Sequence, residues 1–185
     1  MKKYCLFLVF IILFLWCPSY AKKAYIKDIR TEIKQGSLFI SFKLTDCFTD
    51  KMIQAIKNGV NTRFVFLIRL YKVKRLWRDK KIIDLKVVHS IHYDSIKKVY
   101  TLSFSEKSKK LITKDFNEAK KVMSQISKLK LVDIKKLEKG NRYQIRLKAE
   151  LDKIKLPFHL HYVLFFLSLW NFDTDWYKVN LQLYE

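Results

Sequence analysis

Glycine is scarce in this chain of 185 residues, which contains three glycines and two prolines. A phosphate-cradling loop needs two glycines within a few residues and a dinucleotide-binding fingerprint needs three, so the sequence excludes both. The motifs Gly-x-Ser-x-Gly, His-Glu-x-x-His and Cys-x-x-Cys are also missing, which removes the common signatures of hydrolases, zinc proteases and thiol oxidoreductases. We therefore expect a protein that is not an enzyme and binds no cofactor.

Cysteine and histidine are rare as well. Cys5 and Cys17 lie in the first 21 residues, which leaves Cys47 as the single cysteine of the remaining chain and predicts no disulfide. No His or Lys adjoins Cys47, so we interpret it as a small buried hydrophobic residue. His159 and His161 would share a face on a strand, but no third ligand is evident, and we expect no metal site.

Acidic residues are few, with 17 Asp and Glu against 38 Lys and Arg, and the formal charge is +21. This excess predicts an anionic partner, although a lysine-rich composition of the whole chain is the alternative explanation. The densest cationic group is interleaved with Tyr71 and Trp77. It consists of Arg69, Lys72, Lys74, Arg75, Arg78, Lys80 and Lys81. We take these seven residues as candidate contacts to an anion or partner.

A long hydrophobic run near the N-terminus covers residues 5–16. It follows two lysines and precedes Pro18 and Ala21. This order is typical of an export signal, so we predict a signal peptide over 1–21 and a single domain over 22–185. An uncleaved anchor is the alternative. Either form places the domain in the periplasm or tethers it to the inner membrane facing the periplasm, where nucleic acid is not an available partner.

Alternation of apolar and polar residues predicts several strands with one buried face. It is clearest over 141–152, where apolar side chains occupy every second position. The same alternation occurs at 37–44, 85–93, 100–104 and 177–183. Residues 64–68 are apolar on both faces and predict a central strand. The apolar run 156–170 suits a short buried helix or a buried strand, and we favour the helix.

Two amphipathic helices are predicted between these strands. The first has an apolar stripe that includes Met52 and Ile56, and it ends at Gly59. The second covers 114–127 and has Thr113 as its candidate N-cap.

Two further glycines mark turns between strands. Gly36 follows a strand over 24–34 and begins a hairpin, and Gly140 is predicted to turn a strand near 129–137 into 141–152. Hairpins interrupted by helices are typical of an α+β fold. We predict mainly antiparallel β structure, sandwich-like or a curved sheet, with two amphipathic helices after the signal sequence.

Aromatic residues gather near the C-terminus. Trp170, Trp176 and Tyr177 would form, together with Phe172, a stacking platform for a sugar or peptide. The alternative is that these rings close the hydrophobic core, as aromatic residues at the start of a strand commonly do.

The order of these features resembles the domain of unknown function 4390 family of proteobacterial envelope proteins, over nearly all of 22–185. The resemblance is carried by Asn58-Gly59-Val60, Arg75-Leu76-Trp77-Arg78-Asp79, Leu156-Pro157, Ser168-Leu169-Trp170 and Asp175-Trp176-Tyr177. His159, His161 and the high lysine content depart from the family pattern. The resemblance implies an exported or membrane-associated protein with an accessory role beside a membrane sensor system, and it implies no catalytic residues.

Three functions follow as hypotheses. The first is a non-catalytic binding or accessory module of the cell envelope that contacts a protein partner. The second is a basic domain that attaches electrostatically to anionic membrane lipid or lipopolysaccharide. The third is an envelope hydrolase, because paired carboxylates are recognised by their separation in space and not by sequence spacing.

Overall fold

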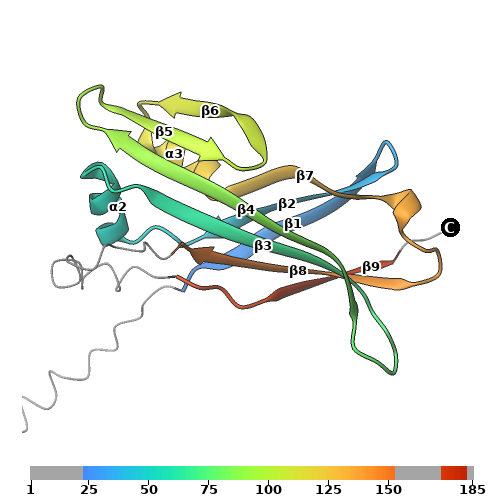
Figure 1. Cartoon of the computed structure of the whole chain (residues 1–185). Helices are drawn as coiled ribbons and strands as arrows, with labels where there is room; N and C mark the ends of the chain where they lie inside the picture. The colour runs from blue at the N-terminus through green and yellow to red at the C-terminus, as the bar shows by residue number, and fades with distance from the viewer. Residues whose placement is uncertain (1–22, 153–171, 183–185) are drawn as a thin grey trace, which may run out of the picture.

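Two antiparallel sheets make up most of the computed structural model, which describes residues 23–152 and 172–182 (Figure 1). The smaller sheet has the order β1 (Tyr25–Lys34), β2 (Ser37–Thr45), β7 (Gln125–Asp133). The larger sheet has the order β6 (Lys107–Thr113), β5 (Val99–Phe104), β4 (Lys80–Asp94), β3 (Thr62–Lys72), β8 (Arg142–Leu151), β9 (Tyr177–Gln182). The predictions for 1–21 and 156–170 lie outside the described residues.

The inner faces of the two sheets form one hydrophobic core. Phe42 on β2 meets Phe66 on β3 edge to face, with 5.7 Å between ring centroids, and both side chains are fully buried. Alternate residues of each strand contribute to this core because successive side chains of a strand point to opposite faces. The fold-class prediction of a mainly antiparallel β fold with two helices is confirmed.

Strand β3 lies between β4 and β8 and has antiparallel partners along both edges. Its inner face buries Phe64, Phe66, Ile68 and Leu70 at zero exposure. Val65 on its outer face is also buried, which agrees with the apolar character of both faces. The prediction of a central strand over 64–68 is therefore confirmed.

Helix α2 (Asp50–Lys57) joins β2 to β3, and its ends follow ordinary capping chemistry. The Met52 backbone N–H donates to Oγ1 of Thr49 at 3.2 Å, which satisfies a donor of the first turn. Gly59 follows the C-cap with φ +84°, a conformation that L side chains rarely adopt. Met52 and Ile56 are fully buried, as the predicted apolar stripe requires.

Helix α3 (Phe116–Met123) is shorter than the predicted 114–127, and Asp115 caps it in place of Thr113. Oδ1 of Asp115 accepts from the Asn117 N–H at 2.8 Å, whereas Thr113 is the last residue of β6. The chain leaves the helix early because residues from Gln125 onward pair with β2. Ile126, expected on the helix, is instead a buried residue of β7 opposite Phe42.

The predicted hairpin around Gly140 is wrong. Gly140 has φ +72° and does make a turn, but β7 belongs to the smaller sheet and β8 to the larger one. The 3₁₀-helix η1 (Ile134–Lys136) and this turn carry the chain across the sandwich. The Tyr143 hydroxyl accepts from the Glu138 N–H at 2.9 Å and donates to the Glu138 carbonyl at 3.1 Å, which fixes the crossing.

A buried histidine joins α3 to the larger sheet. Nδ1 of His89 on β4 donates to the carbonyl of Met123, at the C-terminal end of α3, over 2.9 Å. Nε2 lies 3.1 Å from Oε1 of Glu106, and the ring packs edge to face against Phe66 and Phe104. Burial lowers the pKa of His89, and the nearby Glu106 carboxyl opposes that shift.

Strands β3 and β4 continue past the body of the sandwich as a projecting hairpin (Figure 1). Residues 73–79 form its loop. Within 23–152 and 172–182, no helix combines the length and the apolar character that crossing a membrane requires.

Candidate functional site

The candidate cationic group of the sequence maps to this β3–β4 hairpin. Tyr71 pairs with Lys81 and Lys72 with Lys80, after a register shift beyond Leu70. The loop closes where the Lys74 N–H donates to Oδ1 of Asp79 at 3.3 Å. Antiparallel pairing thus brings both ends of the cationic sequence to one projecting element.

The loop carries the two most exposed apolar side chains near the cations. Leu76 is 87% exposed and Trp77 is 82% exposed. By comparison, Trp176 on the body of the sandwich is 36% exposed. We call residues 74–80, with these two apolar side chains at their centre, the hairpin tip. A large apolar side chain left in water gains nothing from the fold, so its position calls for another explanation.

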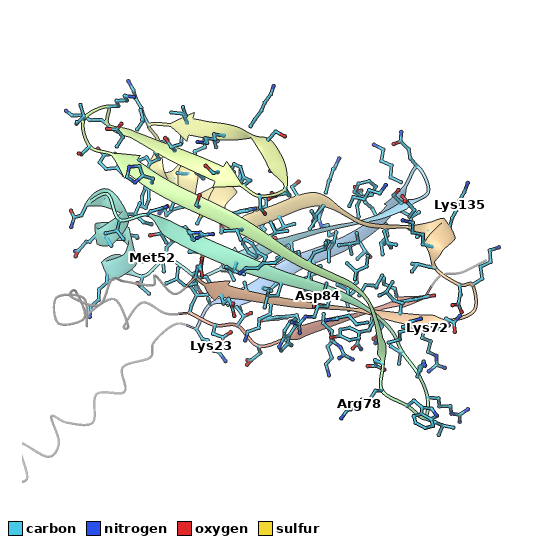
Figure 2. All side chains as sticks on the ribbon, in the orientation of Figure 1. Lys23, Met52, Lys72, Arg78, Asp84 and Lys135 are labelled. Carbon is cyan, nitrogen blue, oxygen red and sulfur yellow. The ribbon has the colours of Figure 1, made fainter. Side chains whose placement is uncertain are left out.

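The seven candidate cations fall into two groups. Arg69, Lys72 and Lys81 lie at the base of the hairpin and form ion pairs with Asp84 or Glu138. The other four lie in the hairpin tip, and in the part of the chain that the structure describes they form no ion pair. These four are Lys74, Arg75, Arg78 and Lys80. Figure 2 shows Asp84 on the sheet, Lys72 at the base and Arg78 on the loop beyond it.

Charge is nearly balanced at the base of the hairpin. Nε of Arg69 donates to Oδ1 of Asp84 at 3.0 Å, and Lys81 binds the other carboxylate oxygen. Hydrogen bonds from Lys81 and Arg69 lower the pKa of Asp84, and a hydrogen bond from Lys72 lowers the pKa of Glu138. Both carboxylates are therefore ionised at neutral pH and offset most of the positive charge at the base, whereas the cations of the hairpin tip have no such ion pairs among the described residues.

Arg146 on β8 connects the loop to the body of the sandwich. Its guanidinium group forms an ion pair with Asp79, and the side chains of both residues are about one-quarter exposed. Nε of Arg146 donates to Gln144 at 2.8 Å, and its guanidinium carbon lies 4.2 Å from the centre of the Tyr71 ring. Because Asp79 also accepts from the Lys74 N–H, these contacts fix how the tip leaves the sheet.

The aromatic candidates do not share one face. The Trp176 ring lies on the outer face of the larger sheet, 4.6 Å from the guanidinium carbon of Arg69. Tyr177 packs against the hydrophobic core on the inner face. Adjacent residues of an extended chain point to opposite sides, so these two rings do not form one platform. Trp170 lies outside the described residues.

A separate hollow of about 290 Å³ lies against the smaller sheet, and its lining includes Asp28 and Glu32. It bears on the hydrolase hypothesis because a general acid needs a raised pKa. Nζ of Lys43 donates to Asp28 at 2.9 Å, and this hydrogen bond lowers the pKa of Asp28. Asp28 is therefore ionised at neutral pH, the opposite of what a general acid requires.

Cys47 precedes helix α2 and is 3% exposed. Burial raises the pKa of its thiol to about 12, so the thiolate that would act as a nucleophile is disfavoured. The interpretation of Cys47 as a buried hydrophobic residue agrees with this position.

Sequence reasoning found the cations but missed the roles of Leu76, Asp79 and Arg146. The apolar pair Leu76-Trp77 between basic residues is a visible signal, because a short basic loop has no core to bury it. The role of Arg146 was not visible, since its contact with Asp79 depends on the pairing of β3 with β8.

Comparison with protein families gives one match, Domain of unknown function (DUF4390), over residues 21–180. No curated protein and no solved structure matches the chain.

Proposed function

The chain belongs to the family described as Domain of unknown function (DUF4390), and we propose that it is an exported, non-catalytic module that binds anionic surfaces of the cell envelope through the hairpin tip. The observation that carries this proposal is the division of the cations. Among the residues that the structure describes, the four basic side chains of the hairpin tip form no ion pair, whereas the three at the base do.

Electrostatic arithmetic supports this function. A basic residue close to an anionic membrane surface contributes about 1 kcal/mol, so the four basic residues of the hairpin tip provide an appreciable attraction. The interaction weakens within about 10 Å at ordinary salt, so side chains that project towards a surface contribute more than lysines spread over the body.

The leader 1–21 supports an envelope location, because its charge and apolar run are those of an export signal. Behind such a signal the available polyanions are lipid headgroups, lipopolysaccharide phosphates and acidic polymers. We place the protein in the periplasm or at the periplasmic face of the inner membrane.

A charge variant tests the function directly. Replacing Lys74, Arg75, Arg78 and Lys80 by Gln is expected to weaken binding to immobilised polyphosphate and to anionic vesicles more than about tenfold at low salt. The matched control replaces four exposed lysines of β6, of α3 and of the turn between them. These are Lys109, Lys110, Lys114 and Lys121. Both variants have the same net charge, so only a local effect of the tip separates them.

Two outcomes contradict the proposal. Equal loss of binding in both variants means that overall charge and not the hairpin tip is responsible. If the unmodified protein binds neither polyanion at low salt but its tip variant leaves the envelope fraction in cells, the partner is a protein and the accessory hypothesis replaces this one.

A further inference from the structure

The hairpin tip combines its cations with two apolar side chains, and a soluble polyanion would use only the cations. We propose that the tip is a membrane-interface anchor, in which Leu76 and Trp77 enter the boundary region of an anionic lipid bilayer while the surrounding basic groups bind lipid phosphates. This inference rests on the proposed function and specifies its ligand as the bilayer itself.

The shape of the tip fits a bilayer better than a folded partner. The β3–β4 hairpin projects from the body of the sandwich (Figure 1). Leu76 and Trp77 in its loop are 87% and 82% exposed, so they offer a protruding apolar point and not a groove. Transfer of such exposed apolar side chains from water into lipid lowers the free energy. A bilayer accepts such a point without a preformed pocket.

The residue types fit the same environment. Tryptophan is enriched at the level of lipid headgroups because its ring is apolar and its N–H remains able to donate a hydrogen bond. Lys and Arg cover apolar surface with their stems and keep the charged end near phosphate. Arg75 and Arg78 directly flank Leu76 and Trp77 in the sequence. The two arginines can therefore contact lipid phosphates while the apolar pair enters the bilayer at the same place.

Two other strongly exposed apolar residues of the described chain stand singly and not as an adjacent pair. Ile96 is 92% exposed at the β4–β5 turn, at the end of β4 opposite the tip, and Ile112 is 64% exposed on β6. Oδ1 of Asp94 accepts from the Ile96 and Lys97 N–H groups, so a carboxylate lies within the β4–β5 turn. These two isoleucines supply a control pair of exposed apolar side chains that lie away from the tip.

The hairpin is held firmly enough for insertion to position the whole domain. Its strands continue β3 and β4 of the larger sheet, and Arg146 fastens its loop through Asp79. Insertion would place the long axis of β3 and β4 at a steep angle to the bilayer, with the core of the sandwich held away from the lipid.

The experiment measures flotation of the protein, in the form that accumulates in cells, with vesicles of phosphatidylcholine alone or mixed with phosphatidylglycerol. A tip variant, L76S with W77S, is compared with a control variant, I96S with I112S. We expect the tip variant to lose at least about tenfold in partitioning to the mixed vesicles, as burial of two large apolar side chains implies. The control variant should bind as the unmodified protein does.

A second readout follows Trp77 itself. Vesicles with bromine atoms on the acyl chains quench tryptophan fluorescence only on close approach. We expect quenching of the unmodified protein. Trp77→Phe should reduce this quenching, whereas Trp176→Phe should leave it unchanged, because the Trp176 ring lies against Arg69 on the body of the sandwich. The difference between these variants isolates Trp77 from the other tryptophans.

The outcomes separate this inference from the proposed function. Charge-dependent binding to vesicles with no effect of L76S and W77S, or with no quenching that depends on Trp77, overturns the anchor and leaves the polyanion-binding function standing. Failure to bind either polyphosphate or anionic vesicles overturns both. Equal binding to neutral vesicles overturns the role given to the cations.

Discussion

Asp79 and Arg146 form an ion pair that joins the β3–β4 loop to strand β8, and the same carboxylate accepts a hydrogen bond from the Lys74 N–H. One acidic side chain therefore connects the two ends of the loop and ties them to the neighbouring strand. The acid does not neutralise the tip, because its charge is already matched by Arg146.

Asp79→Ala, which removes both the ion pair and the acceptor of the Lys74 N–H, should loosen the loop without unfolding the protein. A partly exposed ion pair contributes up to about 1 kcal/mol, so the free energy of unfolding should change by no more than that amount. Backbone amides of 73–79 should exchange with solvent faster, while those of β8 should not. Hydrogen exchange followed by mass spectrometry checks this, and unchanged exchange at Lys74 would contradict the role assigned to Asp79.

Phe66→Ala should be severely destabilising. Phe66 is fully buried between Phe42 and His89, and truncating a buried phenylalanine typically costs about 3–5 kcal/mol. Urea denaturation measures the loss. The control Leu76→Ala removes a side chain that is 87% exposed, and it should change stability by less than about 0.5 kcal/mol. Similar losses in the two variants would mean that the sandwich core is wrongly assigned.

Stability should fall on mild acidification because of His89. Its folded pKa is lowered by burial, so the unfolded chain takes up the proton first as the pH falls below about 6.5. The contribution of neutral His89 is fully present above that pH and is lost as the pH falls towards the folded pKa. Urea denaturation at about pH 7.5 and about pH 5 measures the difference.

His89→Gln should reduce this pH dependence, even though the variant is less stable overall. His92→Gln is the matched control, since His92 is exposed on the opposite face of β4. Asp28, Asp84, Asp133 and Glu138 have lowered pKa values and lose their contribution only at more acidic pH, in all three proteins. An unchanged slope in His89→Gln would show that another group controls the transition.

Cys47 should resist alkylation in the folded protein. With its pKa raised to about 12, the thiolate is a very small fraction at neutral pH, and the side chain is buried. N-ethylmaleimide treatment followed by peptide mass mapping should leave Cys47 unmodified until denaturant is added. Fast labelling under native conditions would contradict its buried position within the β2–α2 connection.

Export should remove the leader after Ala21. The intact mass of protein recovered from the envelope fraction should correspond to a chain that begins at Lys22, as expected for a cleaved signal peptide. A full-length mass in the membrane fraction indicates the uncleaved anchor. A full-length mass in the cytoplasmic fraction contradicts export altogether.

Local sequence patterns predict the helices and strands of this fold better than they predict which strands pair with each other. Alternation along 141–152 indicates a strand with one buried face whatever its neighbours, and Gly59 marks a helix end through its own backbone preference. Ile126 fits a helical spacing after Met123 and a strand equally well, and pairing with Phe42 decides for the strand. Gly140 likewise makes the expected turn, but distant pairing of β7 with β2 sends its two strands to different sheets.

For the candidate site, too, some features are visible in the sequence and others depend on the fold. Clustered Lys and Arg are visible in the sequence, and the two-residue period is enough to separate Trp176 from Tyr177. The sequence does not show which cations form ion pairs. Arg69 contacts Asp84 on the neighbouring strand, and Lys72 contacts Glu138 in the segment that joins β7 to β8. The unpaired charge of the tip is a property of the assembled sheets.

The pairing of β2 with β7 has a consequence for the order in which this chain assembles. Hairpin β1–β2 forms from neighbouring residues, but its inner edge stays open until the chain has continued through α2, four further strands and α3. Closing so long a loop is entropically costly and slows folding. During that interval the exposed backbone of β2 is a site where another chain can add a strand, so the late arrival of β7 makes this edge the part of the fold most open to intermolecular pairing.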